Sequence, residues 1–578
     1  MKRSLALLAL LAMATTTVAL PAQASRRAPA SIRKGGIPDL GLARPFRVPE
    51  HGARLTRKNA ALSSVSTDGL SRALYSGRIT AARFALSRVE SAFDGDVEGA
   101  DMSLLLSDLA LRVRSLSGAA RNRALDLLAR PTDEGVADNP NAGYSYRGAT
   151  TEVDCGEHFC IHWSEAGRHQ IVPTDASGNS VPDYVDSVQA EMEHVWDVQI
   201  DELGFRPPKS DASSENDDVP AQHAAKLDVY LVDSGSDGIY GYCGTDDPNL
   251  VNPFTDYGYW DGSSYCGLDN DFRPAQFGGA PALESLRVTA AHEFFHAIQL
   301  AYSAGHDSWM SEGTAAMMED VVYDEINDNY QYLVASSLRR PFLSLDRNQG
   351  PYHYGVWIFW RFLTELPPMA GAPDMGTDVI RETWEQAAYD GPNAPRLRSK
   401  FAVKAALADH NVSFTAAKSF FSVVNFVPEH FYEEGAAYRV ALGGKRPSLL
   451  GSFTVGRGGT GTRVARLNHL TAGYVALKPA AGVSTLNVAV DLPAASSSPS
   501  ARLITIGWGG ETLEYAFSLE DGIHLLEDVP FARGSVQRAI LVLDNASTRF
   551  SKCQQETPWT CGGPLDDGRQ FAFAAAAR

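Results

Sequence analysis

The spacing of apolar residues divides the chain into a long helical part and a strand-forming end. Residues 283–302 contain no Pro or Gly and many apolar side chains, which predicts a helix. Apolar residues between 106 and 116 recur at spacings of three and four, which predicts another helix. After about residue 445 the pattern changes, because residues 486–492 alternate strictly and further short strands lie between Gly, Pro and Ser clusters. This end is expected to form an antiparallel β-sandwich.

Helix and strand signals alternate between residues 150 and 250. Leu227, Val229 and Leu231 follow the period of two that is typical of a strand. Apolar residues from 192 to 203 instead follow a helical period, which ends at Gly204. Several helical stretches then continue to about residue 430. Together these patterns predict the α+β fold class.

Two histidines lie four residues apart in the long predicted helix. On a helix His292 and His296 stand one above the other on the same face, so both imidazoles can reach a single ion. Glu293 lies one residue round from the first histidine, close enough to act on a metal-bound water rather than on the metal. Two core histidines on a buried helix are the alternative interpretation, because the pattern is short.

A carboxylate downstream completes a candidate metal site. Glu312 follows His296 by sixteen residues, in a stretch that predicts the start of a second amphipathic helix capped by Ser308 or Ser311. Catalytic zinc takes three protein ligands and keeps a position open for water, and two histidines with one glutamate are an established set. We therefore expect His292, His296 and Glu312 to hold zinc.

Other polar residues near the motif have two interpretations each. His306 is a competing third ligand, although Gly305 before it indicates a turn. Glu319 and Asp320 lie about two turns beyond Glu312 on the second helix. They either accept a hydrogen bond from a metal-bound imidazole or are ordinary surface acids.

The segment His292-Glu293-x-x-His296, followed by Trp309-Met310-Ser311-Glu312-Gly313, resembles the gluzincin metallopeptidases. Residues 150–365 as a whole resemble large secreted bacterial metalloprotease-like proteins. The shared stretches include a Gly-Asn-x-x-Pro-Asp segment near residue 180, residues 268–272 and residues 352–355. The resemblance implies a two-lobed zincin-like catalytic domain, with a mixed sheet before the cleft and a helical lobe after it.

The resemblance also implies a reaction. A zinc-dependent peptidase hydrolyses a peptide bond through a metal-bound water, with Glu293 as the general base. Members of the clan often place a tyrosine or histidine downstream of the third ligand to polarise the substrate carbonyl. Tyr354 is the candidate here, with Tyr352 and His353 as alternates. Packing in the core or at the rim of the site is the competing interpretation of these aromatic residues.

An acidic segment upstream follows the frame of a calcium-binding loop. Oxygen donors occupy positions 1, 3, 5, 9 and 12 of twelve, and a helix is expected to follow. Ser180 replaces the usual turn glycine, and an aspartate replaces the final glutamate. A degenerate calcium site and a helix-capping turn therefore both stay open. The candidate ligands are Asp175, Ser177, Asn179, Asp183 and Asp186.

The start of the chain and its cysteines indicate export. Residues 1–24 have the charged start, apolar core and small-residue cleavage site of a signal peptide, and no other stretch is long and apolar enough to span a bilayer. The six cysteines form three close pairs, Cys155–Cys160, Cys243–Cys266 and Cys553–Cys561. Local disulfides are the simplest expectation for an exported protein, with a small zinc site over residues 155–162 as the alternative.

Charge is distributed unevenly. Of the 51 Lys and Arg residues, 21 lie in the first 150 positions, against 13 of the 69 Asp and Glu residues. The remainder is strongly acidic, which argues against nucleic acid or an anionic membrane as its partner. Residues 25–145 are Arg-rich and helical in pattern. They are either a pro-region that packs on the acidic body and keeps the enzyme latent, or a permanent helical domain.

The sequence therefore predicts four regions: a signal peptide (1–24), a helical N-terminal or pro-region (25–145), a zincin-like peptidase domain (146–445) and a β-sandwich (446–578). The expected function is a secreted zinc peptidase that acts on protein or peptide substrates. One rival is a catalytically silent adhesion or scaffold protein with a structural zinc, and another is a hydrolase of non-peptide amides. The sequence carries no signal for oligomeric state.

Overall fold

The structure is a computed structural model of the 578-residue chain. The predicted signal peptide and the pair Cys553–Cys561 lie outside the residues that it describes. The described residues are 53–54, 69–93, 101–133, 143–210, 223–247, 250, 261–347, 351–366, 375–388, 397–517, 521–552 and 562–578.

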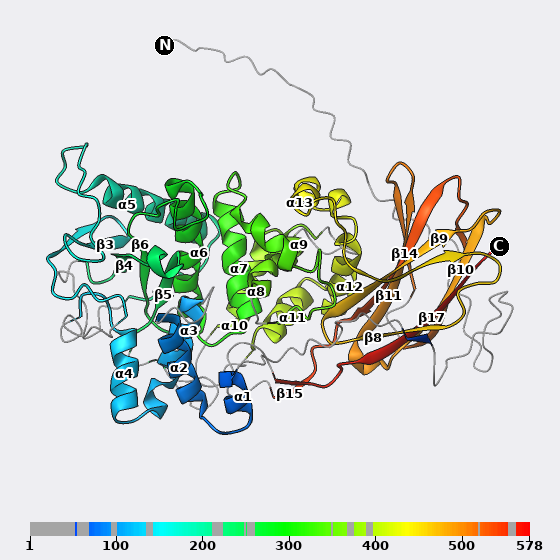
Figure 1. Cartoon of the computed structure of the whole chain (residues 1–578), viewed down its shortest axis with the longest axis horizontal. Coiled ribbons are helices and arrows are strands. Elements are labelled where there is room, and N and C mark those ends of the chain that lie inside the picture. Colours follow the sequence, from blue (N-terminus) through cyan, green and yellow to red (C-terminus); the bar gives the residue numbers. More distant parts are fainter. Residues whose placement is uncertain are drawn as a thin grey trace, which may run out of the picture.

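A mixed five-stranded sheet forms the centre of the first half of the molecule (Figure 1). Its strand order is β2-β3-β4-β6-β5, with the parallel strands β3, β4 and β6 inside and the antiparallel strands β2 and β5 at the edges. The predicted strand at 227–231 is β4, and both of its faces are buried because helices cover the sheet on both sides. The strands are β2 (Thr151–Cys155), β3 (Phe159–Ser164), β4 (Leu227–Val232), β5 (Gly241–Gly244) and β6 (Tyr265–Asp269).

Two groups of helices cover this sheet. One face shares a hydrophobic core with α5 (Asp183–Trp196) and α6 (Ala282–Tyr302). The π-helical turn η2 (Asp197–Glu202) extends α5, and Gly204 after it has a φ of 72°, which ends the helix as predicted. The other face packs against α2, α3 and α4 through Tyr230 and Tyr242. The N-terminal helices are α1 (Gly69–Tyr75), α2 (Ala81–Phe93), α3 (Met102–Arg112) and α4 (Ala119–Leu128).

A buried ion pair also joins the N-terminal helical region to the sheet. Arg130 follows α4 and is fully buried. Its guanidinium lies 2.6 Å from Asp228 of β4 and 2.9 Å from Asp246, which follows β5. The N-terminal region is therefore packed into the molecule by apolar contacts and by buried charges.

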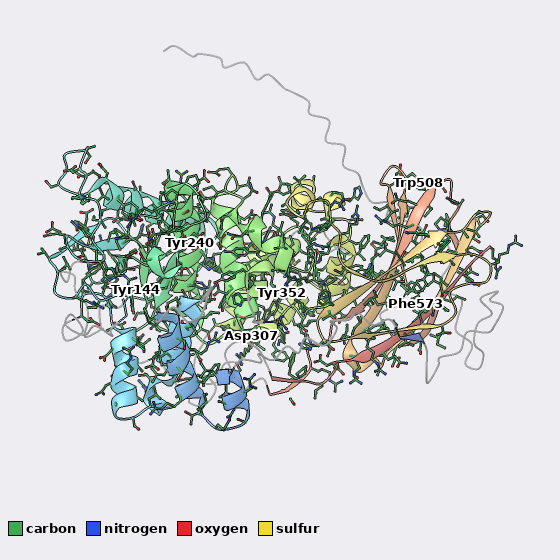
Figure 2. All side chains as sticks on the ribbon, viewed as in Figure 1. Tyr144, Tyr240, Asp307, Tyr352, Trp508 and Phe573 are labelled. Carbon is green, nitrogen blue, oxygen red and sulfur yellow. A yellow bond between two sulfur atoms is a disulfide. The ribbon has the colours of Figure 1, made fainter. Side chains whose placement is uncertain are left out.

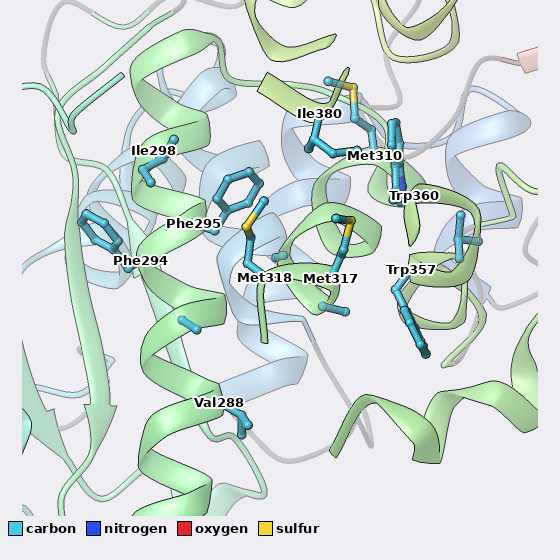
Figure 3. Packing of buried hydrophobic residues seen from close by; sticks show 14 of the residues in the cluster. Val288, Phe294, Phe295, Ile298, Met310, Met317, Met318, Trp357, Trp360 and Ile380 are labelled. Carbon is cyan, nitrogen blue, oxygen red and sulfur yellow. The ribbon is translucent and has the colours of Figure 1, made fainter. Parts of the chain in front are cut away.

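The chain after the sheet is mainly helical, as the sequence predicts, and α6 and α7 pack against each other (Figure 3). Trp309 of α7 stacks on Trp360 of α9 at 5.2 Å. Gly313 allows this close approach, because a Cβ atom there would lie 2.6 Å from the Trp360 indole nitrogen. The helices are α6, α7 (Ser308–Val322), η4 (Asp328–Ala335), α8 (Tyr352–Gly355), α9 (Trp357–Thr364), α10 (Asp378–Ala387), α11 (Lys400–Asp409), α12 (Phe414–Val424) and α13 (Gly435–Ala441).

Two five-stranded sheets at the C-terminal end pack face to face around a shared apolar core. Phe573 lies in that core, whereas Trp508 is exposed at the rim (Figure 2). Most strand pairs are antiparallel, but β1 (Ala53–Arg54) and β7 pair in parallel with β8 and β9 at the sheet edges. The strands are β7 (Leu449–Val455), β8 (Arg463–Leu467), β9 (Thr471–Pro479), β10 (Thr485–Leu492), β11 (Pro499–Gly507), β12 (Thr512–Ala516), β13 (Gly522–Pro530), β14 (Val536–Asn545) and β17 (Arg569–Ala577).

The sandwich is joined to the helical part by an apolar face and by buried charges. Residues at the end of α12 pack on the outer face of the sheet that contains β9, β11 and β14. Beside this contact His469 lies 3.0 Å from Asp346, and Lys400 lies 2.9 Å from the same carboxylate. Across the described residues, no helix has the length and apolar character that crossing a membrane requires.

Candidate metal centre

The centre forms where α6 and α7 face each other. His292 and His296 lie one turn apart on α6, and their ring centroids are 4.9 Å apart. Glu312 lies in the second turn of α7 and is fully buried. The ligand atoms of these three side chains all lie within 4.8 Å of one another. The three residues that the sequence predicts as metal ligands are therefore brought together.

The distances within this group fit a metal ion better than a direct hydrogen bond. The His292 Nε2 atom lies 3.3 Å from Glu312 Oε2, and the His296 Nε2 atom lies 3.4 Å from Glu312 Oε1. Charge-assisted hydrogen bonds between such groups are shorter, at about 2.7–2.9 Å. Tetrahedral zinc with bonds of about 2.0–2.1 Å separates neighbouring ligand atoms by about 3.3 Å. These two nitrogen–oxygen distances match that spacing, and the ligand atoms of all three side chains lie within 4.8 Å of one another.

Both imidazoles are oriented by a partner on their other nitrogen. The His292 Nδ1–H donates to Glu319 at 2.7 Å, and the His296 Nδ1–H donates to Gln299 at 3.0 Å. Gln299 in turn donates to the backbone carbonyl of Ser311 at 2.9 Å, which links it to α7. With Nδ1 protonated in each ring, the Nε2 lone pairs point at the shared position.

The charge around the centre is unbalanced. Five carboxylates line the adjoining cavity, namely those of Asp101, Glu293, Glu312, Glu319 and Asp328, and no Lys or Arg is among its described lining residues. Burial lowers the pKa of His292, but the neighbouring carboxylates of Glu312 and Glu319 outweigh this effect and hold the pKa well above the usual value. Burial also raises the pKa of the Glu319 carboxyl to about 7. Such a site favours a bound cation.

Glu293 lies beside the three ligands and is almost fully buried. Its Oε2 atom accepts a hydrogen bond of 2.9 Å from the Ser103 hydroxyl of α3. The neighbouring strand β5 carries Gly241 at this point, where a Cβ atom would lie 3.0 Å from the Glu293 Cγ atom. The carboxylate is thus held between α6, α3 and the edge of the sheet.

Tyr354 of α8 lines the same cavity, which has a volume of about 280 Å³. Its ring stacks on Tyr332 at 5.0 Å, and its centroid lies 6.0 Å from that of His292. Burial, with the nearby carboxylates of Asp101 and Glu312, raises the pKa of Tyr354 well above its usual value. The hydroxyl therefore stays protonated at neutral pH and can donate a hydrogen bond.

Three other expectations near the motif are settled by contacts. Asp320 lies 3.3 Å from Arg361 and accepts from Asn329, so it does not support a metal-bound imidazole as Glu319 does. His306 packs edge-on against Trp384 and is not part of the three-ligand group. The Tyr352 hydroxyl donates to the backbone carbonyl of Leu343, away from the centre.

The predicted caps of α7 are also wrong. The cap residue is Asp307, and neither Ser308 nor Ser311 precedes the helix. The Asp307 carboxylate makes no capping hydrogen bond, because it pairs with Arg398 at 3.1 Å and with Lys400 at 3.6 Å.

The candidate calcium loop is closed by its own hydrogen bonds. Asp175 accepts from the backbone amides of Gly178 and Ser180, and Asp183 accepts from the amide of Ala176. The remaining candidates pair with these or with one another: Ser177 donates to Asp175, and Asn179 donates to Asp186. These contacts close the loop on itself, but the cap residue of α5 is Pro182 and no side chain caps the helix, so the helix-capping alternative is wrong and calcium stays a prediction.

Two of the three predicted disulfides are present. Cys155 pairs with Cys160 across the β2–β3 turn, and Cys243 pairs with Cys266 across β5 and β6. The alternative zinc site over residues 155–162 is wrong, because its two sulfur atoms are bonded to each other. His162 of that segment instead lies 2.9 Å from Asp228.

Comparison with known protein families gives no match to this sequence, and comparison with characterised proteins gives none either.

Three residues of the site were not predicted from the sequence. Gln299 follows His296 by one helical turn, so its spacing could have revealed it as a hydrogen-bond partner. Asp101 and Ser103 carry no such signal, because they lie about 190 residues before the motif and reach it only through the packing of α3.

Proposed function

We propose that the protein is a secreted zinc-dependent peptidase. The observation that carries this proposal is the close grouping of the ligand atoms of His292, His296 and Glu312, within 4.8 Å of one another, beside the buried carboxylate of Glu293. A zinc ion at this position would act as a Lewis acid and would lower the pKa of a coordinated water. Two disulfides support export, because such bonds persist in oxidising compartments.

Glu293 is the proposed general base. A carboxylate beside the ligand group can take the proton of the attacking water and deliver it to the leaving amine. Tyr354 is the proposed electrophile, because its protonated hydroxyl can donate to the carbonyl oxygen as negative charge develops there. Both side chains line the cavity that the three ligands also line.

The edge strand β5 supports a peptide as the substrate. It lies at the end of the sheet and next to Glu293, and the amide of Cys243 donates to the Ser103 hydroxyl rather than to another strand. An extended peptide can add to an edge strand by backbone hydrogen bonds where the edge is accessible, and in this structure all four residues of β5 are buried. Main-chain binding of this type favours a peptide over a small non-peptide amide.

The test combines metal analysis with digestion of a peptide library. We expect one zinc per chain, and we expect Glu293→Gln to keep the zinc and to lose cleavage. Glu284→Gln is the matched control, because Glu284 lies exposed at the start of the same helix. Tyr354→Phe should lower the rate about 10²–10³-fold, as removal of a single oxyanion donor does.

A structural zinc in a catalytically silent protein is the second candidate. It is favoured by the burial of the three candidate ligands and of Glu293, because structural zinc sites are closed to water. Zinc retained without cleavage in the wild type would contradict the peptidase and support this candidate.

A further inference from the structure

The carboxylate of Glu293 is held by a residue of the N-terminal helical region. Ser103 lies in the first turn of α3, and its hydroxyl donates to the Glu293 Oε2 atom at 2.9 Å. The same hydroxyl accepts from the backbone amide of Cys243 in β5 at 2.9 Å. Ser103 and Glu293 are only 5% and 7% exposed, so water competes little for these contacts. A residue 190 positions before Glu293 thus fixes one of its two oxygens.

The contact with Ser103 uses only one oxygen of Glu293. Among the described residues none donates a hydrogen bond to the Oε1 atom, and Glu293 lines the cavity of about 280 Å³ together with the three candidate ligands. The only proton of the Ser103 hydroxyl points at Oε2, so this hydroxyl is not available as a donor to a substrate. Ser103 therefore acts through Glu293, because it holds the carboxylate in one orientation and leaves Oε1 to take a proton.

The helices around Ser103 cover one face of the central sheet. The apolar core that they share with the sheet includes Tyr230 of β4, Tyr242 of β5 and Tyr265 of β6. The Tyr265 hydroxyl also donates to the backbone carbonyl of Leu128, at the end of α4, at 2.8 Å. Parallel strands are stable when both faces of their sheet are covered. Loss of these helices would therefore expose a buried face of the sheet that carries β5.

The same region completes a buried network of charges. Arg130, which follows α4, lies 2.6 Å from Asp228 of β4 and 2.9 Å from Asp246. The other side of Asp228 faces His162, at 2.9 Å. Removal of one partner from a buried group of charges is strongly destabilising, because the remaining charge is left uncompensated. The N-terminal helices are therefore built into the sheet by polar as well as apolar contacts.

We infer that α2, α3 and α4 are a permanent part of the working enzyme and that Ser103 is a positioning residue for Glu293. This inference rests on the proposed function and names the part of the chain that completes its site. A general base works only when it is held within hydrogen-bond reach of the proton that it takes. Ser103 supplies this constraint, and the packing of α3 on the sheet keeps Ser103 in place. Removal of these helices, as of a pro-region, would release Glu293.

The first test compares cleavage of a peptide from the library digest by the zinc-loaded full chain and its variants. Ser103→Ala should lower kcat about 10–100-fold, up to the smaller contributions that a positioned general base makes, and should leave KM within about twofold. Ser103→Thr keeps the hydroxyl and should restore most of kcat. Ser115→Ala, an exposed position where the helical turn after α3 ends, is the matched control. Equal kcat values for the wild type and Ser103→Ala would overturn the positioning role.

The second test does not depend on cleavage. Urea denaturation of the metal-free wild type, Ser103→Ala, Glu293→Ala and the double variant measures whether the two side chains are coupled. Because one hydrogen bond joins them, the double variant should lose less stability than the two single variants together. Strictly additive losses would overturn the contact on which the inference rests.

The third test asks whether α3 stays with the active protein. Active secreted protein is purified by gel filtration, denatured and mapped by mass spectrometry. We expect the peptide that contains Ser103 in the same amount as the peptide that contains His292. Active protein without residues 81–128 would overturn the inference and leave the peptidase intact. A zinc-loaded wild type that contains these residues and cleaves no peptide would reject the peptidase and the positioning role together.

Discussion

Two buried clusters of histidine and carboxylate in this molecule differ in how their charge is balanced. At the junction with the β-sandwich, His469 lies 3.0 Å from Asp346 and 2.5 Å from Asp567, and Lys400 lies 2.9 Å from Asp346. At the metal centre, five carboxylates line the cavity with two histidines and without a described Lys or Arg.

The difference separates a structural cluster from a binding site. A buried carboxylate is stable when a cation neutralises it. At the junction the protein supplies that cation through Lys400, which also lies 3.8 Å from the ring of Phe550. At the candidate metal centre no described Lys or Arg lines the cavity, so a cation from outside the chain can take that role. An excess of buried carboxylates over Lys and Arg therefore distinguishes the candidate metal centre from the junction.

The largest expected effect is the loss of metal from the centre. Glu312→Gln keeps the side-chain volume but removes one ligand charge, so metal affinity should fall more than about a hundredfold, beyond the range of residues that only support a ligand. Zinc content after dialysis against a weak chelator measures this. Glu284→Gln should keep its zinc, and tight stoichiometric zinc in Glu312→Gln would show that the carboxylate is not a ligand.

Substitution of Lys400 should lower the stability of the fold at the junction and leave metal binding unchanged. Lys400→Met leaves Asp346 and Asp307 buried without this partner, and the free energy of unfolding should fall by about 3–5 kcal/mol. Urea denaturation measures the change, and metal affinity should stay the same. Lys404→Met, an exposed position one turn further along α11, should change stability by less than about 0.5 kcal/mol. A loss of zinc on Lys400→Met would break the distinction between the two clusters.

The junction should also make stability depend on pH. Burial lowers the pKa of His469, but Asp346 and Asp567 outweigh this effect and raise it from 6.5 to about 9. The protonated ring thus stabilises the fold fully below pH 6.5, and this contribution falls as pH rises through 9. Its upper size is about 3 kcal/mol. Urea denaturation of the wild type and His469→Gln between pH 6 and 10 measures it, and parallel curves would contradict it.

The smallest expected effect is on metal affinity when Glu319, which supports His292 by a hydrogen bond, is changed. Glu319→Gln weakens the acceptor for His292 Nδ1, so metal affinity should fall about 10–100-fold while zinc at saturation is retained. Competition with a chelator measures the dissociation constant. Glu325→Gln, an exposed position after α7, is the control. A loss as large as that of Glu312→Gln would make Glu319 a direct ligand.

Local patterns predicted a large part of the fold. The helix expected at 283–302 is α6 at Ala282–Tyr302, and the strand expected at 227–231 is β4 at Leu227–Val232. Such elements follow from the periodicity of side chains along a short stretch of chain. The predicted caps of α7 are wrong because the helix already begins at Ser308, and the carboxylate of the cap residue Asp307 pairs instead with Arg398 and Lys400, about 90 residues away.

The sequence by itself determined the candidate ligands His292, His296 and Glu312, because the first two lie on one helix and the third follows after a short connection. Only the tertiary structure decided that Ser103 donates to Glu293 and that Lys400 neutralises Asp346. The reason is physical: helical spacing fixes neighbours within a few residues, whereas contacts across about 190 residues arise only when apolar faces pack and close the chain on itself.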